Sequence, residues 1–118
     1  MEKRQIVQSE QALHRQVAQY LDLALVPPAF WSTFPAGGGG KRRGAILRGL
    51  GLKPGMPDIW IFDRGATYGG ELKIKGGQLS AEQRHCHELL RRAGIVTEVW
   101  RSLDDVIAFL DRKGVPHR

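Results

Sequence analysis

The sequence predicts an α/β fold in which a mixed central sheet is flanked by helices. Apolar residues recur with helical spacing in several segments, and short runs rich in β-branched and aromatic residues separate them. These segments follow the order helix, strand, short helix, strand, strand, helix, strand, helix. A chain of 118 residues is long enough for one domain with a modest core. We therefore expect a single domain over residues 1–118, with a folded core of about 8–111.

The first helix is expected from about Ser9 to Leu25. Ser9 is a good N-cap residue, and Pro27-Pro28 cannot continue a helix. One buried stripe is expected from residues that recur at helical spacing: Leu13, Val17, Leu21 and Ala24.

The next segments are shorter. Phe30 to Phe34 is aromatic and bounded by prolines, which predicts a strand. The glycine run 37–40 predicts a loop. Lys41 to Leu50 is expected to form a short helix whose inward residues are Ala45, Ile46 and Leu50, and residues 51–57 contain three structure breakers.

Two strands are expected to form a hairpin. Asp58 to Asp63 and Tyr68 to Lys75 both have high β propensity, and the residues between them read as the hairpin connection. The following segment to Ile95 spans about 20 residues, enough for a helical crossover to a parallel strand.

A helix from Ser80 to about Ala93 is expected within this crossover, with Gly94 at its C-terminal cap. Its expected apolar face is Cys86, Leu89, Leu90 and Ala93, whereas its two histidines, His85 and His87, are expected to face solvent. A strand from Ile95 to Trp100 follows. Ser102 then caps a last helix whose expected inward residues are Leu103, Val106, Ile107 and Leu110. The basic tail from Lys113 is expected to be frayed.

Three charged residues of the hairpin are expected to converge. Asp58 opens the first strand, and Glu71 and Lys73 lie two apart in the second, so their side chains share one face of the sheet. Leu72 and Ile74 then face the core. Two carboxylates and a few waters suit Mg²⁺, which polarises phosphates, while a neighbouring lysine orients water or stabilises negative charge. This set predicts metal-dependent phosphodiester hydrolysis.

Two further residues are candidates for the same site. Glu10 precedes Leu13 on the buried stripe of the first helix, where a carboxylate needs a partner, although an acid also simply favours a helix N-terminus. Gln83 is either a site residue or part of a capping box with Ser80. His14, one turn after Glu10, is a candidate to contact the site or DNA, but an exposed or hydrogen-bonded histidine is the favoured interpretation.

The charge of the chain favours an anionic partner, with nucleic acid first and an acidic membrane surface second. The net charge is +6 and the sequence pI about 10.0. The excess is greatest in residues 1–50, which carry 7 Lys/Arg against 3 Asp/Glu. The candidate phosphate contacts are basic side chains before and after the predicted site: Lys41, Arg42, Arg43, Lys53 and Lys75.

The remaining composition excludes other classes. The single cysteine, Cys86, rules out an internal disulfide and a multi-cysteine zinc site, and it is expected to be a buried structural thiol. No apolar run approaches the roughly 18 residues of a membrane span, so no membrane partner is expected. The polar start of the chain lacks an apolar signal core, which favours a cytoplasmic location.

Three stretches of the sequence resemble the VRR-NUC domain of the PD-(D/E)xK nuclease superfamily. They are Pro54-Gly55-Met56-Pro57-Asp58, then Glu71-Leu72-Lys73, then Gly77-Gln78-Leu79-Ser80-Ala81-Glu82-Gln83. The resemblance continues to Gly94 and Val99-Trp100-Arg101-Ser102, and upstream to the helix that bears Glu10. A bare PD…ExK pattern is weak, but these motifs in this order are fairly specific.

The resemblance implies a restriction-endonuclease-like αβββαβ core with a Mg²⁺ or Mn²⁺ site. By the pattern of that family, Asp58, Glu71 and the backbone carbonyl of Leu72 would hold the metal, with Glu10 as a further candidate ligand. Lys73 would act on the attacking water, and Gln83 would lie near the site. The chain looks like the short stand-alone members found in phages and prophages. These resemble homodimeric endonucleases that cut branched DNA such as four-way junctions in DNA repair.

Two alternatives are less favoured. A non-catalytic nucleic-acid-binding module of the same fold would bind DNA in a salt-sensitive way without cleaving it. A structural partner protein would bind no nucleic acid even at low salt. The charged set argues against the binding module, because a protein without catalysis would not need Lys73 beside Glu71.

Overall fold

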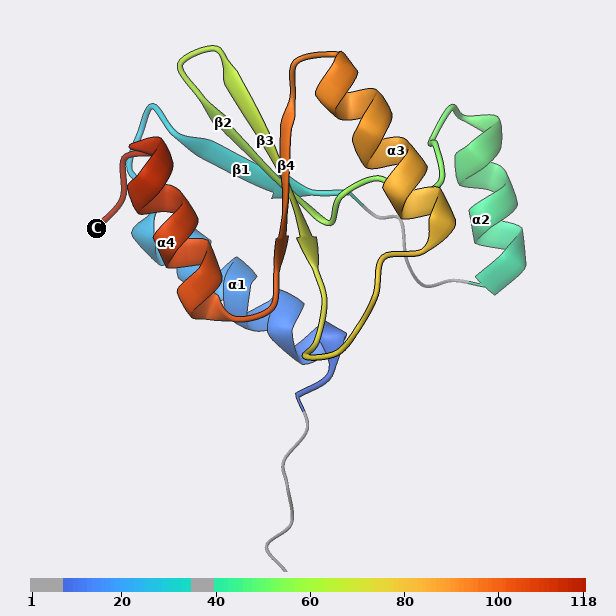
Figure 1. Cartoon of the computed structure of the whole chain (residues 1–118), viewed down its shortest axis with the longest axis horizontal. Coiled ribbons are helices and arrows are strands. Elements are labelled where there is room, and N and C mark those ends of the chain that lie inside the picture. Colours follow the sequence, from blue (N-terminus) through green and yellow to red (C-terminus); the bar gives the residue numbers. More distant parts are fainter. Residues whose placement is uncertain (1–7, 35–39) are drawn as a thin grey trace, which may run out of the picture.

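The computed structural model describes residues 8–34 and 40–118. Eight elements follow one another along the described chain (Figure 1): α1 (Glu10–Ala24), β1 (Phe30–Thr33), α2 (Gly40–Gly49), β2 (Ile59–Asp63), β3 (Ala66–Leu72), α3 (Ala81–Arg92), β4 (Val96–Trp100) and α4 (Leu103–Lys113). The predicted order of helices and strands is confirmed. Most of the predicted glycine loop, residues 37–39, lies outside the described residues.

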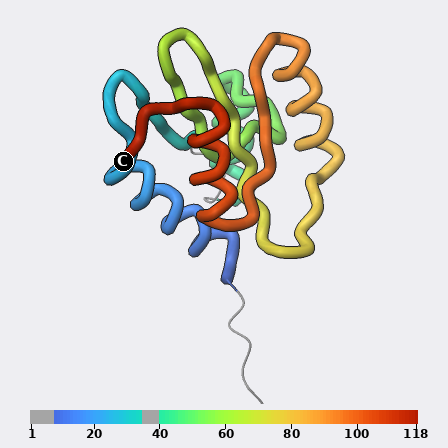
Figure 2. The backbone as a smooth tube through the Cα atoms, turned by 60° about the vertical axis from the view of Figure 1, so that its left-hand side comes forward, coloured from blue at the N-terminus to red at the C-terminus, as the bar shows by residue number. Residues whose placement is uncertain are grey.

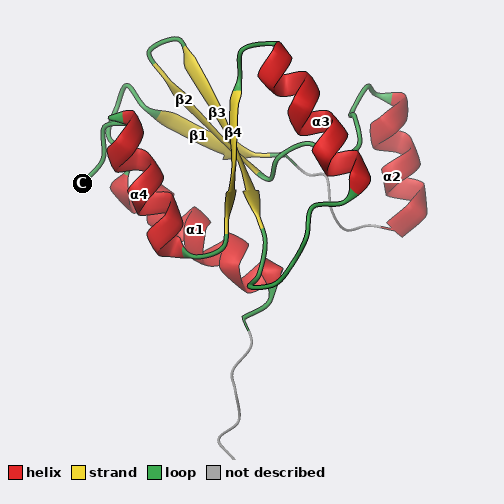
Figure 3. Ribbon diagram, in the orientation of Figure 1, coloured by secondary structure: helices red, strands yellow, loops and turns green. Residues whose placement is uncertain are grey.

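The four strands form one mixed sheet in the order β1-β2-β3-β4. β1 pairs antiparallel with β2, and β2 pairs antiparallel with β3. β3 and β4 are parallel, with Leu72 opposite Trp100, and α3 makes the crossover between them (Figure 3). The mixed sheet with flanking helices, predicted from the order of the segments, is confirmed.

The helices cover the two faces of this sheet unequally. α1 and α4 pack against each other and against β3 and β4, and Figure 2 shows both helices on one side with α3 apart from them. Neighbouring residues of β3 separate the two faces: Leu72 belongs to the core beneath α1 and α4, whereas Glu71 contacts His87 of α3. The buried core cluster is Leu13, Val17, Leu21, Ile59, Ile61, Leu72, Trp100, Val106, Phe109, Leu110 and Val115.

Local signals fix the ends of the helices as the sequence predicts. The Ser9 side chain accepts a hydrogen bond from the Ala12 N–H at 3.0 Å, and Ser102 caps α4 in the same way. Gly94 follows α3 with a φ of 89°, a left-handed conformation that glycine adopts without steric cost.

The β2–β3 hairpin turns through Arg64 and Gly65, whose φ angles are 47° and 85°. Two residues with positive φ are the mark of a type I′ turn, which matches the twist of the paired strands. Further along β3, a Cβ atom on Gly70 would lie 1.9 Å from the Trp100 ring. A glycine at position 70 therefore lets the Trp100 ring pack directly against the strand.

Two predictions about inward faces were wrong. Ile46 and Leu50 are 56% and 80% exposed, Ala45 is exposed too, and α2 contains no buried residue. In α3, Leu89 is 49% exposed and Ala93 is also exposed. The physical reason is the same in both cases: the apolar spacing is present, but no element of the described chain packs over these side chains.

The strand and tail boundaries also differ from expectation. β3 ends at Leu72 rather than Lys75, although the Lys73 N–H still donates to the Trp100 carbonyl at 3.0 Å. The tail is not frayed: Val115 is buried in the core, and the Val26 N–H donates to the Pro116 carbonyl at 3.0 Å. This pairing holds the C-terminus beside the end of α1.

None of the helices in the described ranges is long and apolar enough to cross a membrane.

Candidate active site

The loop that ends at Asp58 is pressed between α3 and β3. Gly55 has a φ of 83°, and a Cβ there would lie 2.4 Å from the Glu82 carbonyl oxygen of α3. The Pro57 ring covers Gly69, where a Cβ would lie 2.9 Å from it. The glycine of the Gly-x-Pro motif thus has a steric origin, because a larger residue at position 55 would displace the loop from α3. A larger residue at position 69 would displace Pro57 from β3 in the same way.

Asp58 is fixed at both its backbone and its side chain. The Thr33 hydroxyl donates to the Asp58 carbonyl at 2.6 Å, and the Leu72 N–H donates to Asp58 Oδ2 at 2.8 Å. This second bond ties the carboxylate to the last residue of β3. Asp58 lies just before β2 rather than within it, yet it converges on the end of β3 as the sequence predicts.

Glu71 lies next to Asp58 and is almost completely buried, with an exposed fraction of 1%. Burial first, and then the hydrogen bond and charge of the neighbouring Glu71, together raise the pKa of Asp58 to about 7. Burial also raises the pKa of Glu71. A buried and a half-buried carboxyl group side by side favour holding a proton, or a cation, over carrying two unneutralised charges.

Lys73 and Glu10 form the other half of the cluster. Lys73 Nζ lies 3.7 Å from Glu10 Oε1, and the lysine side chain is only 13% exposed. The charges of both residues act on the pKa of Glu71, Lys73 lowering it and Glu10 raising it. The first turn of α1, the residue before β2 and the end of β3 thus bring four of the expected site residues together: Glu10, Asp58, Glu71 and Lys73.

His14 lies near the site, which was one of the two interpretations of this residue: its charge acts on Asp58 and lowers the pKa of that carboxyl group. It stands one turn after Glu10 on α1 and is half-buried.

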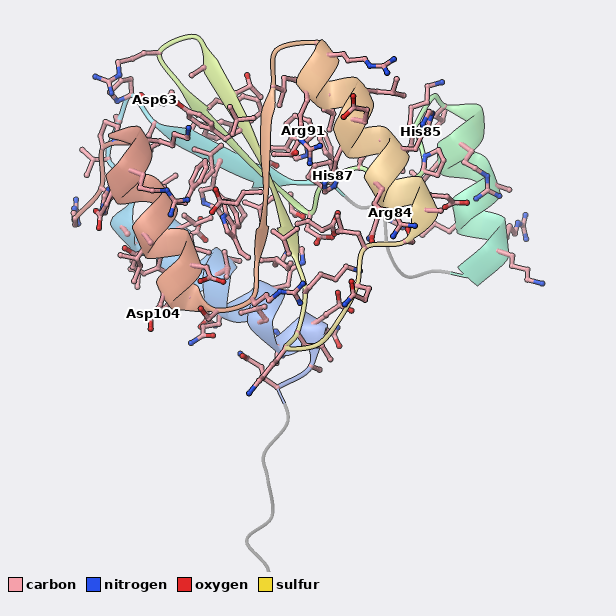
Figure 4. All side chains as sticks on the ribbon, viewed as in Figure 1. Asp63, Arg84, His85, His87, Arg91 and Asp104 are labelled. Atoms are coloured by element: carbon pink, nitrogen blue, oxygen red, sulfur yellow. The ribbon has the colours of Figure 1, made fainter. Side chains whose placement is uncertain are left out.

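His87 was expected to face solvent, and that prediction was wrong. It is completely buried, and its Nε2 lies 3.1 Å from Glu71 Oε1. Figure 4 places it on the side of α3 that faces the sheet, whereas His85 lies toward α2. Burial lowers the pKa of His87, and the charge of Arg91 lowers it further. His87 lies four residues after Gln83 and three residues before Leu90, so the three share one face of α3. This spacing was the feature of the sequence that could have predicted that His87 is buried.

Gln83 forms a complete capping box. Its Oε1 accepts from the Ser80 N–H at 2.9 Å, and its own N–H donates to the Ser80 hydroxyl at 3.1 Å. Of the two readings left open by the sequence, capping is therefore observed. A direct role in chemistry stays a prediction.

Arg101 holds the loop between β3 and α3, which follows Lys73. Its Nη1 donates to the carbonyls of Ile74 and Gly77 at 3.0 and 2.8 Å. Arg101 belongs to one of the stretches that carry the resemblance, but its role in holding this loop was not predicted. Within the same loop, the side chain of Lys75 is exposed, so it is free to contact a polyanion beside the carboxylates.

The other basic candidates lie apart from this cluster. Lys41, Arg42 and Arg43 are exposed in the first turn of α2, which stands beyond α3 as seen from the sheet (Figure 1). Lys53 is exposed and lines an apolar hollow of about 410 Å³ with Met56, Cys86 and Leu89. Cys86 is buried as predicted, and its Sγ lies 3.4 Å from the Met56 sulfur.

The donor set fits a hard divalent cation. Asp58 and Glu71 supply two carboxylates at the end of β3, and a magnesium or manganese ion bound by two carboxylates completes its shell with carbonyl oxygen and water. Over residues 8–34 and 40–118, no three Asp, Glu, His or Cys side chains are grouped to hold a metal by themselves. Glu10 is paired with Lys73 instead.

Comparison with known proteins agrees with this architecture. The chain shares its fold with a solved structure described as a VRR_NUC domain protein: the TM-score is 0.67, with 21% identity, over 90% of this chain and 88% of that one. The sequence matches no protein-family profile, and a search of curated proteins finds no match. The fold expected from the resemblance is therefore confirmed: the protein shares the α/β fold of that VRR_NUC domain protein.

Proposed function

We propose that the protein is a divalent-metal-dependent nuclease that hydrolyses phosphodiester bonds of DNA. The observation that carries the proposal is the buried carboxyl group of Glu71 beside the half-buried carboxyl group of Asp58, next to Lys73. Such a pair is costly without a cation between or beside it, and the nuclease-like fold supports DNA as the substrate.

Asp58 and Glu71 would hold a Mg²⁺ or Mn²⁺ ion, and the Leu72 carbonyl would add a further ligand. When bound, the ion would polarise the phosphate and promote ionisation of the attacking water. Water oxygen forms the new bond to phosphorus while the bond to the sugar oxygen breaks, and that leaving oxygen takes up a proton.

Lys73 would act on the charge that develops during this displacement. Its ammonium group donates hydrogen bonds to a phosphate oxygen or to the attacking water, in a place where little solvent competes. Glu10 holds the lysine in position through the 3.7 Å contact. The exposed Lys75 would contact the phosphate backbone beside the site.

The finer parts of the proposal concern the substrate and the assembly. Branched DNA, such as a four-way junction, is the proposed substrate, and a homodimer is the proposed assembly, because two sites at a fixed separation would suit two strands of a junction. A cleavage panel of single-stranded, duplex, flap and junction DNA separates these substrates, and light scattering measures the mass in solution.

The central test is cleavage by Asp58→Asn and Lys73→Ala with Mg²⁺ or Mn²⁺. We expect both substitutions to lower the rate by about a thousandfold, as loss of a metal ligand or a charge-stabilising group does. Asp104→Asn and Lys113→Ala, which change exposed residues of α4, are matched controls and should cleave normally.

Full activity of Asp58→Asn would overturn the proposal. Salt-sensitive binding by the unaltered protein, with no cleavage of any DNA in either metal, would instead favour the non-catalytic binding module. The exposed basic residues of α2 are compatible with that alternative.

A further inference from the structure

His87 is the one histidine of the described chain that is completely buried. It comes from the second turn of α3, on the side that faces the sheet (Figure 4). Its Nε2 lies 3.1 Å from Glu71 Oε1, and neither side chain is more than 2% exposed. The contact is therefore shielded from solvent, and it is made by the same carboxylate that we place in the site.

The two ring nitrogens of His87 have different surroundings. Nε2 meets the Glu71 carboxylate, whereas Nδ1 is buried without a hydrogen-bond partner among the described residues. A neutral ring carries its proton on one nitrogen only. The proton on Nε2 makes a charge-assisted bond to Glu71 and leaves only a lone pair at Nδ1. The other tautomer would bury an unpaired N–H and point a lone pair at the carboxylate.

Packing alone does not explain a histidine at this position. An apolar side chain would fill the space between α3 and the sheet without leaving a buried nitrogen unpaired, and buried polar groups without partners are destabilising. The hydrogen bond from His87 to Glu71 offsets the cost of burying the unpaired Nδ1. That bond fixes one carboxylate oxygen of Glu71 and leaves the second oxygen free of His87.

We propose that His87 is a positioning residue, which donates its Nε2–H to Glu71 Oε1 and so orients the second oxygen of Glu71 toward Asp58 and a divalent cation. The proposal rests on the proposed function, because Glu71 is taken as a metal ligand. Groups that orient a ligating carboxylate typically change metal affinity by tenfold or more when removed.

The test measures Mn²⁺ affinity by calorimetry, with no DNA present. His87→Gln is the conservative variant, because the glutamine Nε2 stands as many bonds from Cβ as the histidine Nε2 and still donates to Glu71. His87→Asn also carries an amide, but its amide nitrogen is one bond closer to Cβ. His87→Leu fills a similar volume and has no hydrogen-bond donor. His85→Leu, at an exposed neighbour on the same helix, is the matched control.

We expect His87→Asn and His87→Leu to weaken Mn²⁺ binding by about tenfold or more, while His87→Gln and His85→Leu stay near the unaltered protein. Thermal unfolding of every variant is measured alongside. A purely structural role predicts instead that affinity follows the melting temperature, with no rescue by glutamine.

Two failures are distinguishable. If the unaltered protein binds Mn²⁺ and all three His87 variants bind it equally well, the positioning role is wrong while the metal site stands. If the unaltered protein binds no Mn²⁺, the proposed function fails and the positioning role fails with it. Nitrogen NMR of the metal-free protein adds an independent check, since a proton on Nδ1 of His87 would also overturn the proposal.

Discussion

The two faces of the sheet differ in what they bury. Beneath α1 and α4 lies a closed apolar core, in which Phe109 meets the rings of Tyr68 and Trp100 edge-on at 5.3 and 5.2 Å. Beneath α3, the adjacent positions bury Glu71 and His87. One step along β3, from Leu72 to Glu71, separates apolar packing from a charged cluster. The stability of this fold is thus built on one face, which lets the other carry polar groups that cost stability.

The largest effect should come from breaking the apolar face. Phe109→Ala removes a completely buried ring, and such truncations cost about 3–5 kcal/mol in the free energy of unfolding. Urea unfolding measures the loss. Because α4 lies across the sheet from His87, the Mn²⁺ affinity of the fraction that stays folded should not change. A loss of affinity without loss of stability would contradict the separation of the two faces.

The charged face should respond to pH in the opposite sense to an ordinary ion pair. The pKa of Asp58 is about 7 in the fold, against 3.8 for the unperturbed group. Between these two pKa values the folded protein holds a proton on Asp58 that the unfolded chain releases. The contribution of protonated Asp58 to the free energy of unfolding is therefore complete below about pH 4 and is lost as the pH rises through 7.

In metal-free buffer with a chelator, we expect the free energy of unfolding to fall by about 1–2 kcal/mol between pH 5 and pH 8, discounted because solvent reaches Asp58. Urea unfolding at several pH values measures this. Asp58→Asn should flatten the profile over that range. A stability that rises with pH in the unaltered protein, and not in the variant, would be the contrary result.

The smallest effect concerns the basic residues that lie beyond both faces. Replacing Lys41, Arg42 and Arg43 of α2 by alanine should weaken DNA binding severalfold and reduce the slope of log affinity against log salt by about 2–3, if each contacts one phosphate. Filter binding at several salt concentrations measures both quantities.

A matched control removes three exposed charges elsewhere: Arg91, Arg92 and Lys113, at the C-terminal ends of α3 and α4. This variant should keep the original slope. Equal slopes for the α2 variant and the unaltered protein would show that α2 does not touch the phosphate backbone.

The sequence by itself determined the features that depend on near neighbours along the chain. The spacing of Leu13, Val17 and Leu21 predicted the buried stripe of α1, and Ser80 with Gln83 predicted the start of α3. The convergence of Asp58 with Glu71 was also predictable, because a hairpin brings the two strands together whatever else packs on them.

Only the tertiary structure decided which side chains are covered. Ile46 and Leu50 have the spacing of an inward face but stay exposed, because no described element lies over α2. His87 has the polarity of a surface residue, yet the crossover places α3 against β3 and buries it on Glu71. Burial depends on which distant segment arrives at a surface, and a periodic pattern within one helix carries no information about that partner.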